Sequence, residues 1–267
     1  MKNGEEAVDK IKKEHPEAKI SMMQLDLGSL RNIEAFAKKF LEMNLPLNIL
    51  INNAGVACPK ALTQDGIEMI FGVNHIGHFY LTKLLLPALE QAGTVGNPSR
   101  VVNLSSLVNW MFAPDNGIKF DDINGDKDFT FWERYGKSKL ANILFSRELN
   151  QRMKAENKNI ISVSLHPGGI LRTEFSRHMT VASFLNLYFS LRPHTFWQGG
   201  VFQKRKTIEQ GSATSIVCAL DPDVIPGEYY ADSKLETRLV HPKASDTELA
   251  KKLWDFIEEL IASKTSN

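Results

Sequence analysis

The sequence predicts one α/β domain over residues 1–267, with a doubly wound parallel sheet flanked by helices. Three observations lead to this fold class. Short apolar runs typical of buried strands alternate with longer segments of helical periodicity. No repeat, low-complexity stretch or linker divides the chain. Small and polar residues follow the apolar runs, as expected where ligands bind beyond the carboxyl ends of parallel strands.

The first half of the chain shows this alternation from its beginning. Ser29 is the expected N-cap of the second helix. The run LNILIN at 47–52 is almost continuously apolar, as in a strand buried on both faces. The expected elements, in order, are a polar helix over 4–14 that ends before Pro16, a strand over 20–27, an amphipathic helix over 29–43, a strand over 47–52 and a largely helical segment over 63–91.

The second half continues the same pattern. Before the end helix, Ser245 and Glu248 have the spacing of a capping box, in which each side chain binds a free backbone N–H. The expected elements are a strand over 100–105, a helix over 131–156, a strand over 160–165, a helix over 207–219, a last strand over 228–231 and an end helix from 245.

Composition and charge exclude several classes of function. The 32 basic and 31 acidic residues leave a net charge of +1, whereas a nucleic-acid-binding protein needs clustered excess cation. The two cysteines, Cys58 and Cys218, form no metal-binding or disulfide pattern, so we expect no metal site and a reducing compartment. Residues 1–15 do not resemble a signal peptide, and no apolar stretch reaches the about 20 residues that span a bilayer. A cytoplasmic location is expected.

Two polar motifs follow predicted strands. The motif Asn-Asn-Ala-Gly (NNAG, 52–55) places small residues where a ligand can approach the backbone. Asn and Gly also form ordinary turns, and the motif alone leaves both interpretations equally open. Ser105 and Ser106 end the next apolar run. For this pair alone, capping or turn formation is the stronger interpretation.

Tyr135 and Lys139 open a helical pattern and are four residues apart, so they share one face of a helix. A phenol has a pKa of about 10, and a nearby ammonium favours the phenolate and lowers that pKa. A Tyr–Lys pair of this kind can therefore act as a general acid/base. Tyr230 and Lys234 have the same spacing, but they lie in a predicted strand and turn where the two side chains do not meet. We interpret Tyr230 as structural.

A Pro-Gly turn follows the predicted strand at 160–165. The motif HPGG at 166–169, with Thr173 shortly after it, is common punctuation at a strand end. The same residues also expose backbone groups to a ligand without an obstructing side chain. Both interpretations remain open from this motif alone.

The order of these motifs resembles the short-chain dehydrogenase/reductase family. NNAG, Asn74 in a helix, the serine pair, YxxxK and Pro-Gly with a following Thr carry the resemblance, which runs from about Asp26 onward. Three details are similar to the retinol dehydrogenase and WW-domain-containing oxidoreductase branch: VNHIGHFYLT at 73–82, a long insert at 110–132 and YGKSKLAN at 135–142. The resemblance implies a Rossmann-like fold and NAD(P)-dependent interconversion of an alcohol and a carbonyl compound.

The resemblance also implies a role for each of four catalytic residues. Tyr135 would donate a proton in carbonyl reduction and accept one in alcohol oxidation. Lys139 would lower the pKa of Tyr135 and bind the nicotinamide ribose. Ser106, the second serine of the pair, would hold the substrate oxygen. Asn74 would anchor a water that connects Lys139 to solvent.

The cofactor that the resemblance implies is NADP or NAD, and only the resemblance favours NADP. Asp26 would meet the adenine and Asn53 would lie along the ribose. Without the resemblance, Asp26 would pass as an acid at a helix start and Asn74 as a solvated helix residue. The resemblance places these residues around the cofactor: Asp26, Leu27, Asn53, Ala54, Gly55, Tyr135, Lys139, Pro167, Gly168 and Thr173.

The segment 175–205 is rich in aromatic and aliphatic residues and would form a substrate lid. An apolar lid implies a small apolar alcohol or carbonyl substrate, such as a retinoid, a steroid or a lipid aldehyde. Core packing explains the same composition equally well. In this branch of the family, such segments also contact membrane surfaces.

The glycine-rich loop TGxxxGIG, which binds the cofactor pyrophosphate in the family, is absent from the sequence. We therefore expect an N-terminally truncated chain that lacks the first two strands and that loop. In the usual strand order, those strands lie between 20–27 and 47–52, so their loss would leave a gap of roughly 10 Å. The first 45 residues then rearrange, another segment fills the gap, the chain aggregates, or the sequence is an incomplete gene model or splice form, which we favour.

Two hypotheses of function follow. The leading one is an oxidoreductase, and the alternative is a catalytically impaired fragment or splice form that acts as a binding or regulatory protein. A methyltransferase is disfavoured because it has no need for a Tyr–Lys helix pair. The resemblance also allows a homodimer through 63–91 and 131–156, and membrane association facing the cytoplasm if a preceding segment carries an anchor.

Overall fold

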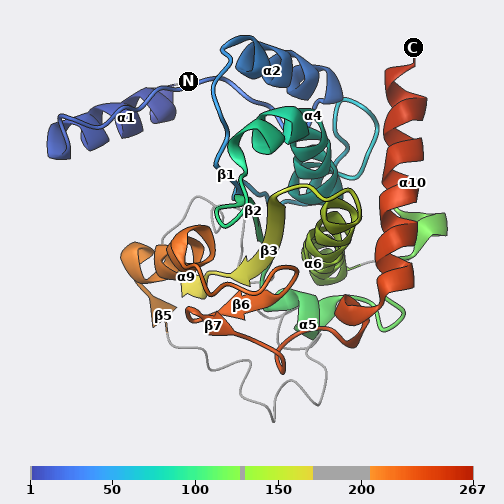
Figure 1. The fold of residues 1–267 in the computed structure, drawn as a ribbon. Helices are drawn as coiled ribbons and strands as arrows, with labels where there is room; N and C mark the ends of the chain where they lie inside the picture. Colours follow the sequence, from blue (N-terminus) through green and yellow to red (C-terminus); the bar gives the residue numbers. More distant parts are fainter. Residues whose placement is uncertain (1, 127–129, 171–204, 267) are drawn as a thin grey trace.

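The computed structural model describes residues 2–126, 130–170 and 205–266, which form an α/β fold around one main sheet (Figure 1). The sheet order is β1-β2-β3-β6-β7. The first four of these strands are parallel, and β7 pairs antiparallel with β6. The strands are β1 (Ile49–Asn52), β2 (Ser99–Leu104), β3 (Ile160–His166), β6 (Tyr229–Ala231) and β7 (Lys234–Leu235); the short strands β4 (Gly169–Ile170) and β5 (Arg205–Lys206) pair separately.

Strand register brings the carboxyl ends of β1, β2 and β3 to one edge of the sheet. Asn52 lies opposite Asn103, and Leu104 lies opposite Leu165. The adjacent residues Val101 and Val102 point to opposite faces of the sheet, and both are fully buried because helices cover both faces. Residues that follow these strands are therefore neighbours in space although they lie far apart in the sequence.

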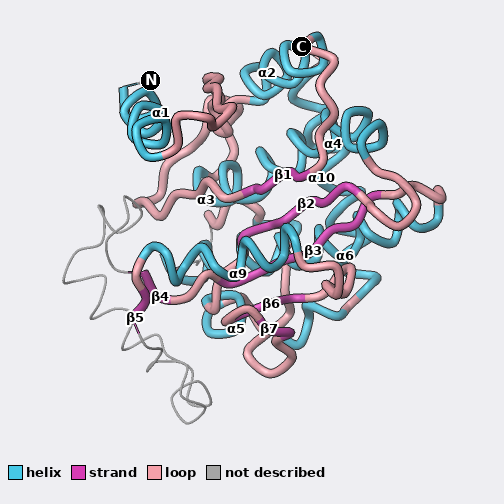
Figure 2. Tube along the Cα trace, turned by 60° about the vertical axis from the view of Figure 1, so that its left-hand side comes forward, coloured by secondary structure: helices cyan, strands magenta, loops and turns pink. Residues whose placement is uncertain are grey.

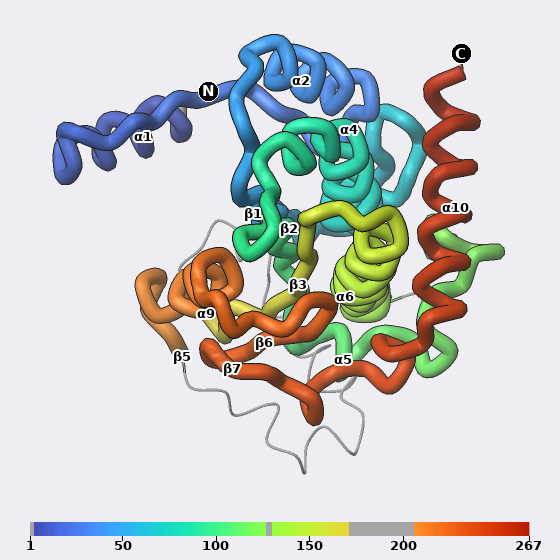
Figure 3. The backbone as a smooth tube through the Cα atoms, viewed as in Figure 1, coloured from blue at the N-terminus to red at the C-terminus, as the bar shows by residue number. Residues whose placement is uncertain are grey.

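Helices form a layer on each face of the sheet (Figure 3). On one face, Val101 and Ile160 join the large core with apolar residues of α2, α4, α6 and α10, and on the other, Val102 and Val163 pack with Cys218 of α9. Helix α1 lies apart from the sheet (Figure 2). The α-helices are α1 (Lys2–Glu14), α2 (Leu30–Glu42), α3 (Met69–Phe71), α4 (Gly77–Ala92), α5 (Val108–Phe112), α6 (Phe131–Ala155), α9 (Ile208–Leu220) and α10 (Thr247–Thr265).

Helix α10 packs across the outer side of α4 and α6. Trp254 stacks on Phe145 with ring centroids 5.7 Å apart and meets Phe79 edge-on at 4.8 Å. Lys83 of α4 forms an ion pair with Glu258 of α10. None of the described helices is long and apolar enough to cross a membrane.

The strand predicted over 20–27 is wrong, because these residues form no strand in the structure. A β-strand is stable only beside a neighbour that accepts its backbone hydrogen bonds, and no described strand pairs with this segment. The outer edge of β1 is likewise without a described strand partner, and Ile51 is 44% exposed there. The following helix is confirmed, and its N-cap is Ser29 as predicted.

Two further elements differ from the prediction. The helical part of 63–91 begins only at Met69 and includes a π-helical turn over Gly72–Ile76. The strand near 228–231 is not the last, because Asp232 and Ser233 adopt positive φ and turn the chain into β7.

The predicted capping box at the end helix is also wrong. The N-cap of α10 is Asp246, whose Oδ1 accepts a hydrogen bond from Leu249 N at 3.0 Å. Ser245 instead ends a 3-10 turn over Pro242–Ser245 and donates back to the Pro242 carbonyl at 3.2 Å. A carboxylate next to a hydroxyl is the stronger acceptor for a helix N-terminus.

Candidate active site

The predicted Tyr–Lys pair lies near the start of α6, beside the carboxyl end of β2. Thr130 and Glu133 cap this helix reciprocally: Glu133 N donates to Thr130 Oγ1 at 3.3 Å, and Thr130 N donates to Glu133 Oε2 at 2.8 Å. The cap fixes where the helix begins, and so places Tyr135 in its second turn.

Tyr135 and Lys139 lie on the same face of α6, as predicted. Both are buried, with 7% and 5% of their surface exposed. Lys139 Nζ lies 5.6 Å from the centroid of the Tyr135 ring. The same Nζ donates a hydrogen bond to the Leu104 carbonyl, at the end of β2, at 3.1 Å. The lysine thus ties the helix to the strand end that carries the serine pair.

The prediction about Lys139 and the pKa of Tyr135 left out the largest influence on that pKa, which is burial. Burial away from water raises the pKa of Tyr135 well above its ordinary value, and a hydrogen bond with the Ser106 side chain offsets only part of that rise. Burial also lowers the pKa of Lys139 to about 8. Near pH 7, Tyr135 is therefore a neutral phenol that can donate a proton, and Lys139 remains largely charged.

The structure gives the two serines different contacts. Ser105 is buried, and its Oγ donates to the Lys139 carbonyl at 2.7 Å, so it holds the helix against the strand. Ser106 is half-buried and hydrogen-bonds Tyr135 through its side chain. The second serine is thus the one that shares the reactive hydroxyl's surroundings.

Asn74 lies in the π-helical turn and is fully buried, so it is not a solvated helix residue. Its side chain brackets the loop after β1: Oδ1 accepts from Val56 N at 2.7 Å, and Nδ2 donates to the Val56 carbonyl at 3.0 Å. A Cβ added at Gly55 would lie 3.2 Å from Asn74 Oδ1 and 3.7 Å from Lys139 Nζ. The glycine therefore brings open backbone next to both side chains.

The residues predicted to line the cofactor lie at the ends of two strands. Asn53, Ala54 and Gly55 are exposed directly after β1. Pro167 and Gly168 follow β3, and Gly168 has a φ of +96°, which favours glycine. Thr173 and most of the predicted lid at 175–205 lie outside the described residues.

Asp26 and Leu27 lie before α2, and the structure gives them local contacts. Asp26 is exposed, and its Oδ1 accepts from Gly28 N at 2.8 Å in a turn at the helix start. Leu27 packs against the large core. Its carbonyl lies so close to Gly77 that a Cβ added there would be only 2.5 Å from the oxygen. The hydrogen bonds of Asp26 fit the simpler interpretation as an acid at a helix start.

Sequence reasoning missed a buried polar network beneath the site. Asn52 Nδ2 donates to Asn103 Oδ1 at 2.8 Å, and Asn103 Nδ2 donates to Ser162 Oγ at 3.1 Å, which links three neighbouring strands. It also missed His75 and Asn142, which contact each other at 3.0 Å beside Asn74. Asn142 lies three residues after Lys139, and that helical spacing was the available signal.

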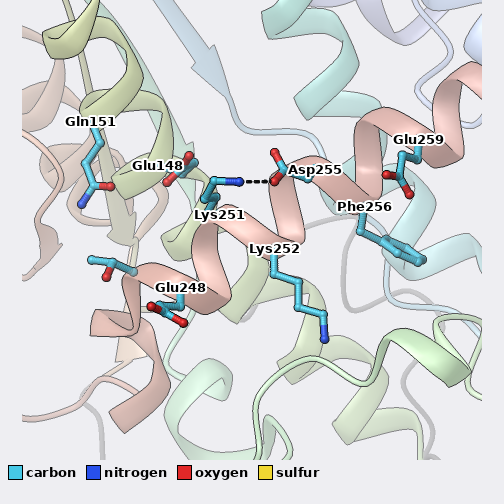
Figure 4. Close-up of a pocket in the computed structure, with 9 residues that line it drawn as sticks. Glu148, Gln151, Glu248, Lys251, Lys252, Asp255, Phe256 and Glu259 are labelled. Carbon is cyan, nitrogen blue, oxygen red and sulfur yellow. Dashed lines mark hydrogen bonds and ion pairs between the residues drawn. The ribbon is translucent and has the colours of Figure 1, made fainter.

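A hollow of about 650 Å³ lies elsewhere, between α6 and α10 (Figure 4). Its lining is largely charged, and Lys251 and Asp255 form an ion pair across one turn of α10. None of the predicted site residues lines it. Among the described residues, no group of three or more His, Cys, Asp or Glu side chains is arranged to hold a metal ion.

Known proteins resemble this chain over most of its length. Residues 1–116 match the family described as short chain dehydrogenase. Short-chain dehydrogenase TIC 32 A, chloroplastic, of Brassica napus is 41% identical over 257 residues, which cover 93% of this chain and 74% of that protein. Retinol dehydrogenase 14 of Homo sapiens is 42% identical over 89% of this chain and 66% of its own. Retinol dehydrogenase 12 of Mus musculus is 38% identical over 97% of this chain and 75% of its own.

Solved structures share the fold. An uncharacterized protein from Mycobacterium paratuberculosis is 29% identical with a TM-score of 0.64, over 90% of this chain and 74% of that one. The NADPH-bound carbonyl reductase from chicken fatty liver is 20% identical with a TM-score of 0.56, over 87% of this chain and 82% of that one. At that identity the second likeness concerns the fold alone.

Proposed function

The chain belongs to the short-chain dehydrogenase family of NAD(P)-dependent oxidoreductases, and we propose that it interconverts an apolar alcohol and the corresponding carbonyl compound. One observation carries the proposal. Ser106, Tyr135 and Lys139 meet at the carboxyl end of β2, where the first hydrogen-bonds the second and the third lies against its ring. Asn74 joins them through the backbone at Gly55.

The acid/base step follows from the protonation of these groups. Because its pKa is raised, Tyr135 carries its proton near pH 7 and can donate it to a carbonyl oxygen during reduction. Ser106 is placed to hold the same oxygen through its hydroxyl. The charge of Lys139 stabilises the phenolate that remains, and the reverse sequence serves alcohol oxidation.

The residues at the strand ends fit the nicotinamide part of NAD(P), which supplies or accepts the hydride when it is bound. Gly55 presents backbone beside Lys139 without a side chain between them, and a Cβ there would already be tight against Asn74. Asn53, Pro167 and Gly168 would border the same group. Neighbours of the same fold are described with NADPH, NADP or NADH, so either NADP or NAD fits the proposal.

The apolar character of the substrate is supported by two features. Tyr135 belongs to a buried cluster with Trp110, Met111, Phe112 and Trp132, so the reactive hydroxyl lies beside an apolar wall. Several relatives are named retinol dehydrogenases. A retinoid or a lipid aldehyde is therefore the substrate class we propose. A cytoplasmic or cytoplasm-facing membrane location stays a prediction.

The proposal is tested by NADPH-dependent reduction of all-trans-retinal and of nonanal, with the Tyr135→Phe variant. Removing the proton donor should lower kcat by about 100-fold or more. The matched control is Tyr230→Phe, the same change at the other YxxxK position, where the hydroxyl only accepts a hydrogen bond from Ile225 N at 2.8 Å. Full turnover by Tyr135→Phe would refute the assignment.

A further inference from the structure

Asn142 lies on α6, one helical turn after Lys139, and is almost fully buried. Its Nδ2 donates to two backbone carbonyls, Asn74 O and Leu104 O, each at 3.0 Å. Leu104 O is also the acceptor for Lys139 Nζ at 3.1 Å. One amide group therefore joins the catalytic helix, the end of β2 and the π-helical turn.

Both carbonyls lie where regular backbone hydrogen bonding is interrupted. Leu104 is the last residue of β2, and Asn74 is in the middle of the π-helical turn. Buried carbonyls at such points need side-chain donors. Asn74 O meets a second one, His78 Nδ1, at 3.1 Å. Both side chains can donate to this carbonyl at once, because a carbonyl oxygen has two lone pairs.

The two carbonyls fix which way the Asn142 amide points, and this orientation sets the tautomer of His75. Because Nδ2 faces two carbonyls, Oδ1 must face His75 Nδ1, which lies 3.0 Å away. The hydrogen of this bond therefore belongs to His75 Nδ1, and Nε2 carries none.

The surroundings of His75 agree with that tautomer. Its Nε2 is buried without a hydrogen-bond partner. The ring lies among Phe71, Phe79 and Phe145, at centroid distances of 5.2 to 6.4 Å. Burial lowers the pKa of His75 to about 4, so the ring is neutral near pH 7.

We propose that Asn142, held in a single orientation by neutral His75, is a positioning residue for the acid/base site. Its hydrogen bonds fix the position of the Leu104 carbonyl, which accepts a hydrogen bond from Lys139. They also fix the position of the Asn74 backbone, whose side chain holds the loop after β1. This inference rests on the proposed function, because it assumes that Lys139 and Asn74 serve the reaction.

Loss of the Asn142 hydrogen bonds should move the groups around Tyr135 without disturbing the hydrophobic core. Without the Asn142 amide, Lys139 would hold the Leu104 carbonyl alone, and the π-helical turn would keep the longer bond from Asn74 Nδ2 to Ser138 Oγ of α6, at 3.3 Å. Both groups could then shift relative to Tyr135 although the hydrophobic core is unchanged. Displacement of about 1 Å at a reacting centre costs up to about 100-fold in rate.

The first test is Asn142→Leu, which keeps the side-chain volume and removes both donors and the acceptor. We expect kcat for retinal reduction to fall by about tenfold to 100-fold, with the KM values for NADPH and aldehyde close to those of the wild type. The matched control is Asn150→Leu, the same substitution further along α6, beside Gly227, which should leave turnover unchanged. Wild-type kcat in folded Asn142→Leu would overturn the proposal.

The second test is His75→Phe, which fits the aromatic surroundings and removes the buried Nε2. Its melting temperature should stay near that of the wild type, because the lost hydrogen bond is offset by removal of an unpaired polar atom. Its kcat should nevertheless fall, because Asn142 Oδ1 loses its donor and the amide is held less firmly against the two carbonyls. A purely structural role would leave kcat unchanged, and that result would contradict the proposal.

A readout without turnover separates this inference from the proposed function. The ¹⁵N shifts of His75, assigned by their loss in His75→Phe, should show hydrogen on Nδ1 and none on Nε2 at pH 7. Hydrogen on Nε2 would overturn the orientation of Asn142 whatever the activity. A wild-type chain that shows the expected tautomer but turns over no aldehyde would refute the proposed function, and with it the positioning role.

Discussion

The carboxyl ends of β1 and β2 are neighbours in the sheet, yet the protein covers them differently. At the end of β2, Ser105, Lys139 and Asn142 bind backbone carbonyls inside a buried network. At the end of β1, residues 53–55 are exposed, and Ile51 is 44% exposed on the outer edge. The acid/base half of the site is thus built by the protein itself, whereas the cofactor half presents open backbone for a ligand to complete.

The largest effect should come from Lys139 in the buried half. Lys139→Met keeps the length of the side chain but removes the charge and the bond to Leu104 O. We expect kcat for carbonyl reduction to fall by about 100-fold or more. Lys137→Met, two residues earlier on α6, removes a lysine that binds the Ile123 carbonyl instead and should retain most activity. Equal losses in the two variants would contradict the assignment.

Stability should distinguish buried Asn74, which holds the loop after β1, from exposed Asn53 in that loop. Asn74→Leu removes the partners of the half-buried backbone N–H and carbonyl of Val56, so the unfolding free energy should fall by about 1 to 2 kcal/mol. Asn53→Leu changes an exposed residue and should stay within about 0.5 kcal/mol of the wild type. Urea unfolding followed by circular dichroism measures both. Similar values for the two variants would show that the comparison is mistaken.

Cofactor affinity should respond to a single methyl group at the exposed end. In Gly55→Ala the added Cβ lies 3.2 Å from Asn74 Oδ1, on the surface proposed for the nicotinamide. Binding of NADPH should weaken by about tenfold, which is about 1.4 kcal/mol. Gly169→Ala is the control, because a Cβ there meets nothing within 4 Å. Unchanged affinity for NADPH in Gly55→Ala would show that the cofactor does not bind against this loop.

The pH dependence of reduction should report the smallest effect. Burial lowers the pKa of Lys139 from 10.5 to about 8, so the ammonium is fully present below that pH and is lost as pH rises through it. The kcat/KM for carbonyl reduction should therefore decline above about pH 8. The pKa of Lys137 is also lowered to about 8, so Lys137 is a second candidate for the cause of the decline. If Lys137→Met shows the same decline, the decline comes from Lys139. A flat profile to pH 9 in the wild type would contradict the assignment.

Local signals in the sequence were sufficient for many elements and for the centre of the site. The cap at Ser29, the buried run in β1 and the four-residue spacing of Tyr135 and Lys139 depend on neighbours in the chain. Each of these features depends on residues a few positions apart, so the sequence alone is enough to predict it. Asn74 and Ser106 required the family resemblance, because an asparagine in a helix and a second serine carry no signal of their own.

The features that were missed depend on contacts between distant segments. The strand predicted over 20–27 has a suitable pattern, but pairing decides whether a pattern becomes a strand. The pKa of Tyr135 is raised because of its burial, which the spacing to Lys139 does not reveal. His75 and Asn142 are 67 residues apart in the sequence, and only the π-helical turn brings them into contact.

Calorimetric titration of the folded 267-residue chain with NADPH, and then with NADH, tests the central claim most directly. We expect saturable binding, which should be weakened in Gly55→Ala and unchanged in Gly169→Ala. Absence of saturable binding with both nucleotides, in a sample shown to be folded, would contradict the claim that this chain is an oxidoreductase as it stands.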